Sequence, residues 1–433
     1  MRTSIIKHIE NPFQFKQILL TWSQQFREVI FLDSNDYPQQ YFSYDCLLAV
    51  DAFTSIKTDY HNAFEDLKQY QQVTKDWLFG YLSYDLKNDI EDLLSNNFDG
   101  LSFPDLFFFQ PKKLFLLKGN QLEIQYLNMC DDEVSADFEE ISLQIADCRL
   151  QITDSMYSEI EIKQRISKDN YLDKVSNLLE HIHRGDFYEV NFCMEFYIEN
   201  AVINPLDKFF KLNEISKSPQ AVFFKNNAHF LLSASPERYI KKEGDLLISQ
   251  PIKGTAKRFR DPIEDEKSKN ELASDPKEYA ENIMVSDLVR NDLSRTAQKG
   301  SVKVEELCVI YTFEQVHQMI STITSKIDSQ YTAIDAIKTT FPMGSMTGTP
   351  KVSVLKIIEE LEETKRGLYS GAVGYFTPNG DFDFNVVIRS ILYNQENKYV
   401  SFSVGSAITS LSIPEKEYEE CLLKAKAMRE VLR

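Results

Sequence analysis

The sequence lacks an excess of basic side chains, clustered cysteines and long apolar runs, and each absence narrows the class of protein. Its 433 residues hold 48 Lys and Arg against 66 Asp and Glu, which gives a net charge of -18 at pH 7. A protein that follows a nucleic-acid backbone needs a basic stripe, so this balance argues against that class. An anionic small-molecule substrate stays possible, because a local basic pocket can lie within an acidic surface.

The few cysteines are scattered and form no CxxC pair and no Cys/His cluster. They are Cys46, Cys130, Cys148, Cys193, Cys308 and Cys421. This usage fits a reducing cytoplasm and no structural zinc. The first residues show no long apolar segment before a charge, so we expect no signal peptide. No apolar run approaches the ~18 residues of a membrane span. We therefore expect a cytoplasmic protein.

The composition is that of a folded chain with a large core, since 43% of the residues are hydrophobic and 12% are aromatic. The length indicates two domains, or one core with subdomains. An acidic stretch over 131–150 divides an N-terminal scaffold, residues 1–150, from a second part, residues 151–433, in which turn and helix-end signals are clearer. No Gly/Ser linker joins them, so we expect the two parts to share an interface.

Turn and capping signals predict several elements of the second part. A helix over 168–184 opens at Ser167 and stops at Gly185, and a long helix opens at Asp275-Pro276 and runs to about 299. A hairpin follows over 371–394, with its turn at Asn379-Gly380. The chain closes with an amphipathic helix, "PEKEYEECLLKAKAMREVL".

A lysine at the end of an apolar strand, in "SQPIKGT", is the first candidate for chemistry. Lys253 lies between Ile252 and Gly254. A desolvated amine gives up its proton more readily and becomes a nucleophile or base, and the glycine permits close backbone approach of a ligand. The alternative is a surface lysine at a turn.

A glutamate in "SASPERY" is the second candidate. Glu237 follows a strand end, sixteen residues before Lys253, a separation that suits two adjacent antiparallel strands. A carboxylic acid beside a lysine is a workable pair of acid and nucleophile. The alternative is a rim glutamate paired with Arg238 or Lys241.

Two predicted helices carry the same pair of carboxylates. Glu278 and Glu281 lie on one face of the first helix, and Glu417 and Glu420 lie on one face of the last. If the faces meet, they form an oxygen site suited to Mg²⁺, which binds one or two carboxylates together with substrate oxygens. The alternative is two solvated helix faces.

Two further features could hold an anion. The loop "GSMTGTPK" over 344–351 lacks the spacing of a nucleotide-binding P-loop, but its turn into a helix N-terminus can bind a carboxylate. Arg389 lies among apolar residues in a strand and needs an anionic partner if it is buried. A substrate carboxylate and an internal Asp or Glu both satisfy that need.

Together these stretches resemble the chorismate-utilising enzymes, which include the large subunits of anthranilate synthase and aminodeoxychorismate synthase and the isochorismate synthases. The motifs occur in order over about 185–427. They are "GDFYEVNF", "SASPERY", "PIKGT", "KEYAENIMVSDLVRNDLSR", "FPMGSMTGTPK", "GAVGYF" followed by "IRS", and "EYEECLLKA". The resemblance implies an α+β fold of two subdomains, an antiparallel β-sandwich flanked by helices, with the site in the cleft between them.

Within that family Lys253 resembles the aminodeoxychorismate synthases, because anthranilate synthases usually have alanine there. The resemblance therefore implies component I of aminodeoxychorismate synthase, a transferase that aminates chorismate at C4 to 4-amino-4-deoxychorismate for 4-aminobenzoate and folate. The lysine adds to the ring at C2, and Glu237 protonates the departing C4 hydroxyl. Ammonia then adds at C4 and the lysine leaves.

The resemblance also implies the binding groups and partners. Mg²⁺ on the ring carboxylate would be held by Glu281 and Glu420, with Glu278 and Glu417 on the same faces. The substrate carboxylates would be held by residues that the family motifs share: Arg389, Tyr375, Gly405, Thr347 and Gly348. The sequence contains no Gly-x-Cys-x-Gly nucleophile elbow, so ammonia would come from a separate glutamine amidotransferase subunit.

The chain departs from the family pattern at several positions. Glu189 stands where glutamine is usual, Gln318 where histidine is frequent, and Ala407 where glycine is usual. Two alternatives therefore stay open: component I of anthranilate synthase, which would also release pyruvate, and a catalytically inactive relative that binds chorismate.

Overall fold

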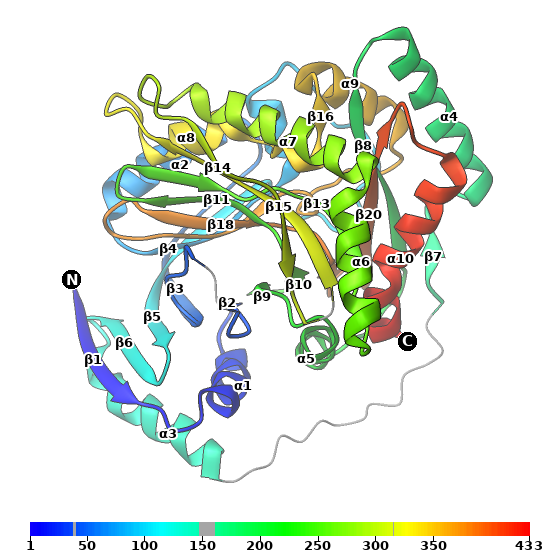
Figure 1. Cartoon of the computed structure of the whole chain (residues 1–433). Coiled ribbons are helices and arrows are strands. Elements are labelled where there is room, and N and C mark those ends of the chain that lie inside the picture. Colours follow the sequence, from blue (N-terminus) through cyan, green and yellow to red (C-terminus); the bar gives the residue numbers. More distant parts are fainter. Residues whose placement is uncertain (38–39, 147–160, 315) are drawn as a thin grey trace.

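The fold is built on one connected antiparallel sheet, seen in a computed structural model that describes residues 1–37, 40–146, 161–314 and 316–433 (Figure 1). The described residues form 20 strands joined by hydrogen bonds into this sheet. The strands are β1 Arg2–His8, β2 Glu28–Asp33, β3 Cys46–Thr58, β4 Leu78–Leu82, β5 Leu106–Lys118, β6 Gln121–Leu127, β7 Lys163–Gln164, β8 Glu189–Ile198, β9 Gln220–Asn226, β10 His229–Ser235, β11 Arg238–Glu243, β12 Leu246–Ser249, β13 Ile252–Lys257, β14 Lys303–Thr312, β15 Val316–Lys326, β16 Gly348–Thr349, β17 Ala372–Phe376, β18 Phe382–Val386, β19 Ser390–Asn394 and β20 Tyr399–Thr409.

The order of the strands brings distant parts of the sequence together. From one end, hydrogen-bonded neighbours run β14, β15, β12, β11, β18, β17, β4, β5, β3, β2, β9, β10, β19, β20 and β8, and β13 follows β12 along the same edge of β15. Although β13 and β8 lie far apart in this order, they are joined by a side-chain contact. The sheet therefore curls back on itself, and β13 comes close to β8.

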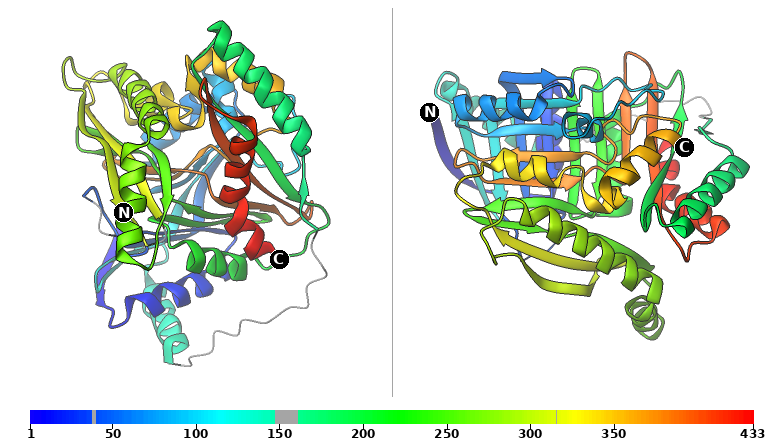
Figure 2. Two further views of the ribbon diagram at one scale, coloured as in Figure 1. Left: turned by 45° about the vertical axis from the view of Figure 1, so that its right-hand side comes forward. Right: turned by 90° about the horizontal axis from the view of Figure 1, so that it is seen from above.

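Helices cover the outside of the curled sheet. They are α1 Pro12–Trp22, α2 Ala63–Thr74, α3 Val134–Ala146, α4 Lys168–Arg184, α5 Pro205–Ser216, α6 Pro262–Ser274, α7 Pro276–Ser294, α8 Ala333–Thr340, α9 Lys351–Leu361 and α10 Pro414–Leu432, with short 3₁₀ turns η1 Ser23–Gln25, η2 Tyr84–Asp89, η3 Asp131–Glu133 and η4 Gly344–Met346. Helix α7 packs on β13, β14 and β15, and α10 packs on β20 and against α4 and α5 (Figure 2). This arrangement is the α+β fold that the sequence predicts, with a large antiparallel sheet and flanking helices.

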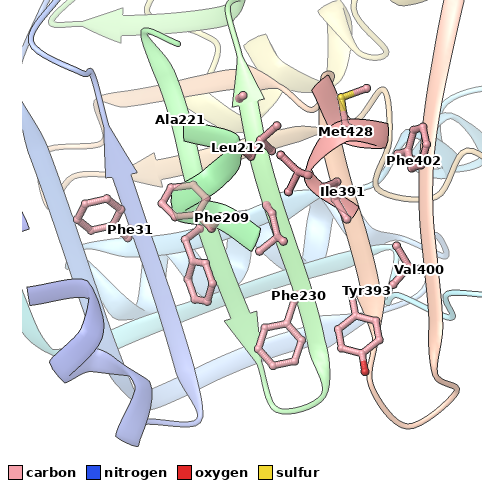
Figure 3. Packing of buried hydrophobic residues seen from close by; sticks show 14 of the residues in the cluster. Phe31, Phe209, Leu212, Ala221, Phe230, Ile391, Tyr393, Val400, Phe402 and Met428 are labelled. Atoms are coloured by element: carbon pink, nitrogen blue, oxygen red, sulfur yellow. The ribbon is translucent and has the colours of Figure 1, made fainter. Parts of the chain in front are cut away.

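The core between the sheet and α5 and α10 consists of rows of apolar side chains on neighbouring strands. Alternate residues of β2, β9, β10, β19 and β20 point to one face, where the two helices cover them (Figure 3). The labelled members are Phe31, Phe209, Leu212, Ala221, Phe230, Ile391, Tyr393, Val400, Phe402 and Met428. Burying each large apolar side chain contributes about 1.5–3 kcal/mol, so this packing fixes where the strand ends of the site lie.

The capping signals predict the helix boundaries well. The Ser167 side chain accepts a hydrogen bond from the Asn170 N–H, and α4 ends at Gly185 with φ of 93°. The side chain of Asp275 likewise caps α7. That helix stops at Ser294 rather than near residue 299, because the chain turns there into the segment that leads to β14.

The predicted domain boundary at residue 150 falls within 147–160, outside the described residues. On either side of it the described chain is interleaved, because β2 pairs with β9 and β4 pairs with β17. The expected shared interface is thus a pair of strand ladders. No helix among the described residues is long and apolar enough to cross a membrane.

Candidate active site

The candidate site is a cleft where β13 comes close to β8. It has a volume of about 460 Å³, and its walls come from β8, β13, β15, β20, α7 and α10. Most of the charged candidates from the sequence line it: Glu237, Lys253, Glu278, Glu281, Arg389 and Glu420. Residues that lie up to 183 positions apart therefore face one space.

A larger hollow of about 700 Å³ lies elsewhere, between α1 and α5. Its buried cation, Lys16, is already neutralised by Asp33 at 3.0 Å and Asp36 at 2.7 Å. The cleft between β13 and β8 differs because it combines a nucleophile, an acid and a guanidinium that has no carboxylate partner among the described residues.

Lys253 lies in the floor of the cleft and is 9% exposed. Its Nζ lies 2.7 Å from Oε1 of Glu189, which is 2% exposed and begins β8. Burial alone would lower the pKa of Lys253, but Glu189, Glu281 and Glu237 outweigh it and raise that pKa above its ordinary value. The expectation of a dry amine that loses its charge is therefore wrong for the free protein, in which Lys253 is an ammonium.

Glu237 lies between β10 and β11 and is 4% exposed. Burial raises the pKa of its carboxyl to about 7, against the opposing effects of Ser345, Lys253 and the Ile252 backbone. Glu237 can therefore carry a proton at neutral pH and release it within the same pH range, as a general acid requires. The expected placement on adjacent antiparallel strands agrees with the structure. In the β11–β12 hairpin Lys241 lies opposite Ile248 and Glu243 opposite Leu246, and the same register puts Glu237 opposite Ile252, the neighbour of Lys253.

Arg389 lies between β18 and β19 and lines the cleft. Among the described residues its guanidinium has no ion pair within 4 Å, and its backbone adopts φ of 52°. Burial lowers the pKa of the guanidinium, although Tyr369 and Glu420 oppose that effect. A half-buried cation without a carboxylate partner among the described residues favours the substrate-carboxylate alternative over the internal ion pair.

The tyrosine of the cleft is Tyr369, not Tyr375 as predicted. Tyr375 is on β17, where its ring stacks on Phe79 at 5.6 Å and packs against Trp77, and it lines a separate hollow. The strand alternation turns it away from the cleft. Tyr369 lies in a turn without a regular pattern, so no sequence signal distinguished it.

Three of the four predicted metal ligands line the cleft: Glu278, Glu281 and Glu420. Glu281 Oε1 is buried without a hydrogen-bond partner among the described residues, and the Lys277 ammonium lies 3.6 Å away. Burial also raises the pKa of Glu281 to about 8. These oxygens suit Mg²⁺, although no group of three or more ligands within the described residues is already arranged around a metal position.

The fourth predicted ligand, Glu417, lies outside the cleft lining. It is 1% exposed, its Oε1 lies 2.8 Å from Lys277 Nζ, and its other oxygen accepts a hydrogen bond from Ser406. The prediction of a ligand role is therefore wrong for Glu417, which joins α7, α10 and β20.

Thr347 and Gly348 of the glycine loop support the site rather than lining it, contrary to prediction, whereas Ser345 and Met346 of the same loop do line the cleft. The Thr347 hydroxyl bonds to backbone carbonyls of its own turn, and the Thr347 carbonyl accepts a hydrogen bond from Asn191 N–H. Gly348 has φ of 147°, and a Cβ there would lie 2.0 Å from the Glu189 carbonyl oxygen. Both residues therefore hold β8 in place. Gly405 does line the cleft, where a Cβ would lie 2.6 Å from Cys193 Sγ.

The departures from the family pattern also lie in the cleft. Gln318 and Ala407 line it, and Gln318 Oε1 is buried without a partner among the described residues. The neighbouring His317 points away and lies 3.1 Å from Asp265. An unsatisfied amide oxygen in the wall offers a hydrogen-bond acceptor to a ligand.

Comparison with known proteins identifies the class to which this cleft belongs. The model of the chorismate binding enzyme family matches residues 27–430. The chain therefore belongs to the chorismate binding enzymes. The anthranilate synthase component I of Streptococcus pneumoniae TIGR4 has the same fold, with a TM-score of 0.77 and 24% identity over 92% of this chain and 96% of that one.

Relatives named for two different activities are similar to this chain. It is 35% identical to the chloroplastic aminodeoxychorismate synthase of Arabidopsis thaliana, over 84% of this chain and 41% of that protein. It is 31% identical to aminodeoxychorismate synthase component 1 of Bacillus subtilis, over 88% of this chain and 80% of that protein. It is also 31% identical to anthranilate synthase component 1 of Acetivibrio thermocellus, over 81% and 73%. The chain spans less than half the length of the two plant relatives it matches.

Proposed function

We propose that the protein is component I of aminodeoxychorismate synthase, which aminates chorismate at C4 to give 4-amino-4-deoxychorismate. The observation that carries this proposal is the presence of Lys253 and Glu237 in one cleft. Sequence identity alone does not decide, because relatives named for either activity are equally similar at 31%. The choice therefore rests on what a lysine can do at this place.

Displacing the C4 hydroxyl requires an acid, because hydroxide is a poor leaving group. Glu237, with a pKa of about 7, supplies the proton at the C4 oxygen. The Lys253 amine forms a bond to C2 as the C4–O bond breaks, and ammonia then bonds to C4 as the C2–N bond breaks. An alanine at position 253 could not form the first bond, so the lysine selects amination at C4.

The other cleft residues bind and orient the substrate. The Arg389 guanidinium is free to pair with a substrate carboxylate, and Tyr369 and Gly405 border the same space. Glu281, Glu278 and Glu420 would hold Mg²⁺, which when bound would neutralise the ring carboxylate. Ammonia would be supplied by a separate glutamine amidotransferase subunit, by analogy with the component 1 relatives.

Product analysis tests this function against its closest rival. The purified protein is incubated with chorismate, Mg²⁺ and ammonium, and the products are separated by chromatography. We expect 4-amino-4-deoxychorismate without pyruvate, and no such product from Lys253→Ala. Anthranilate fluorescence with pyruvate release would refute the proposal in favour of anthranilate synthase. Failure of the wild type to consume chorismate would favour an inactive relative.

A further inference from the structure

The ion pair between Lys253 and Glu189 raises a question that the proposed function leaves open. An ammonium has no lone pair and cannot attack a ring, so Lys253 must lose a proton before each bond forms. Among the described residues, Glu189 Oε1 is the one hydrogen-bond acceptor within reach of Lys253 Nζ, at 2.7 Å. Within the described part of the chain, the proton therefore has one direct acceptor, Glu189.

The backbone of Glu189 is held on both sides. It pairs with Thr349 of β16 on one side and with Thr409 of β20 on the other. The close approach of Gly348 to the Glu189 carbonyl fixes the strand further. A carboxylate that is 2% exposed and anchored in this way is positioned for one partner.

We propose that Glu189 is the proton acceptor for Lys253, holding the amine as an ammonium between turnovers and taking its proton when it attacks the ring. The attack itself rests on the proposed function, whereas the ion pair does not. Two carboxylates then flank the lysine with opposite tasks: Glu189 accepts a proton, and Glu237 donates one.

The proton transfers balance over one turnover. A Lys253 N–H bond breaks and its proton goes to Glu189 Oε1, while the nitrogen lone pair forms the bond to C2. The C4–O bond breaks, and that oxygen takes the proton of Glu237 and leaves as water. Ammonia then bonds to C4, the C2–N bond breaks, and the neutral Lys253 amine recovers its proton from Glu189. The new C4 ammonium returns a proton to Glu237.

This arrangement predicts a particular dependence on pH. Lys253 faces Glu189 from β8, Glu281 from α7, Glu237 from the β10–β11 connection and Glu420 from α10. Moving a proton from Lys253 to Glu189 changes no net charge, so the reactive form of the pair does not vary with solution pH. If Glu189 cannot accept the proton, the proton must go to water. The fraction of Lys253 in the neutral amine form then increases tenfold per pH unit.

The test compares Glu189→Gln with the wild type over pH 5.5–9, at saturating Mg²⁺ and a fixed concentration of unprotonated ammonia. In the wild type we expect kcat/KM for chorismate to be level below pH 7 and to fall tenfold per unit above it, as Glu237 loses its proton. In Glu189→Gln we expect it to rise tenfold per unit below pH 7 and to be level above. Parallel profiles, at whatever rate, would overturn the inference. Glu199→Gln, exposed at the far end of β8, is the control.

A second measurement needs neither turnover nor a variant that folds. Lysines of the wild type are labelled with an amine-reactive reagent at a series of pH values, and the peptides are quantified by mass spectrometry. We expect Lys253 to reach half of its maximal reactivity at higher pH than Lys257, an exposed lysine of the same strand. Half-maximal labelling of Lys253 at lower pH would overturn the ion pair. If Lys253 labels at higher pH than Lys257 but the enzyme's product is not 4-amino-4-deoxychorismate, the proposed function is wrong while the ion pair with Glu189 stands.

Discussion

Replacing Glu237 with glutamine tests the burial of the proposed acid through stability as well as through rate. Glutamine keeps the shape of the side chain but carries neither the charge nor the acidic proton. The structure predicts a loss of activity together with a gain of stability. The amination rate should fall ~10²-fold or more, as the loss of a general acid does, while the folded protein at alkaline pH should become more stable than the wild type.

The size of the stability effect follows from the pKa. Folding raises the pKa of Glu237 from 4.5 to about 7, chiefly through burial. A group whose pKa is raised on folding gives its full stabilisation below the unfolded pKa and loses it as pH rises through the folded pKa. Between pH 5.5 and 8.5 the wild type should therefore lose about 2 kcal/mol through this carboxyl, and Glu237→Gln should not.

Urea unfolding of both proteins at pH 5.5, 7 and 8.5, followed by tryptophan fluorescence, measures this difference. We expect the free energy of unfolding of Glu237→Gln, relative to wild type, to increase by about 2 kcal/mol across the series. Glu243→Gln, at the exposed end of β11, controls for the general effect of removing a carboxylate. A stability difference that does not change with pH would refute the assignment of Glu237 as a buried acid that titrates near neutrality.

Three further substitutions probe substrate binding, the support of β8 and the core. Arg389→Gln should raise KM for chorismate ~10–100-fold, because it removes a charge-assisted hydrogen bond. The control Arg260→Gln changes an exposed residue and should leave KM unchanged. Equal KM values for the two variants in initial-rate assays would exclude Arg389 from carboxylate binding. Gly348→Ala should destabilise the protein by more than about 1 kcal/mol in urea unfolding, because its Cβ would lie 2.0 Å from a backbone oxygen and its φ is 147°; an unchanged midpoint would contradict this. Phe209→Ala should cost about 3–5 kcal/mol and Phe13→Ala, at an exposed position, under about 1 kcal/mol; similar losses would contradict the described core.

Local signals in the sequence predict the elements of the fold more reliably than their contacts. Ser167 and Gly185 mark the ends of α4, because capping depends on residues within one turn of the helix. The contact of Lys253 with Glu189 depends on two strands, β13 and β8, that lie far apart in the strand order. Since 64 residues separate the two, no local pattern could predict their contact.

The candidate site shows the same division. Periodicity places Glu278 with Glu281 and Glu417 with Glu420, but it cannot show that Lys277 already binds Glu417. Alternation along a strand cannot show which of its faces borders a cleft, so the family motif led to Tyr375. The charge composition, by contrast, correctly allows a local cationic site, here Lys253 and Arg389, within an acidic protein.

The central claim is that the Lys253 amine bonds to the substrate ring, and the most direct test is the mass of the peptide that carries it. The protein is mixed with chorismate and Mg²⁺ without ammonia, quenched in acid, digested and analysed by mass spectrometry. We predict a Lys253 peptide heavier by the mass of chorismate less one water, and no such adduct in Glu237→Gln at short times. Wild-type turnover without that adduct, together with full amination activity in Lys253→Ala, would contradict the account.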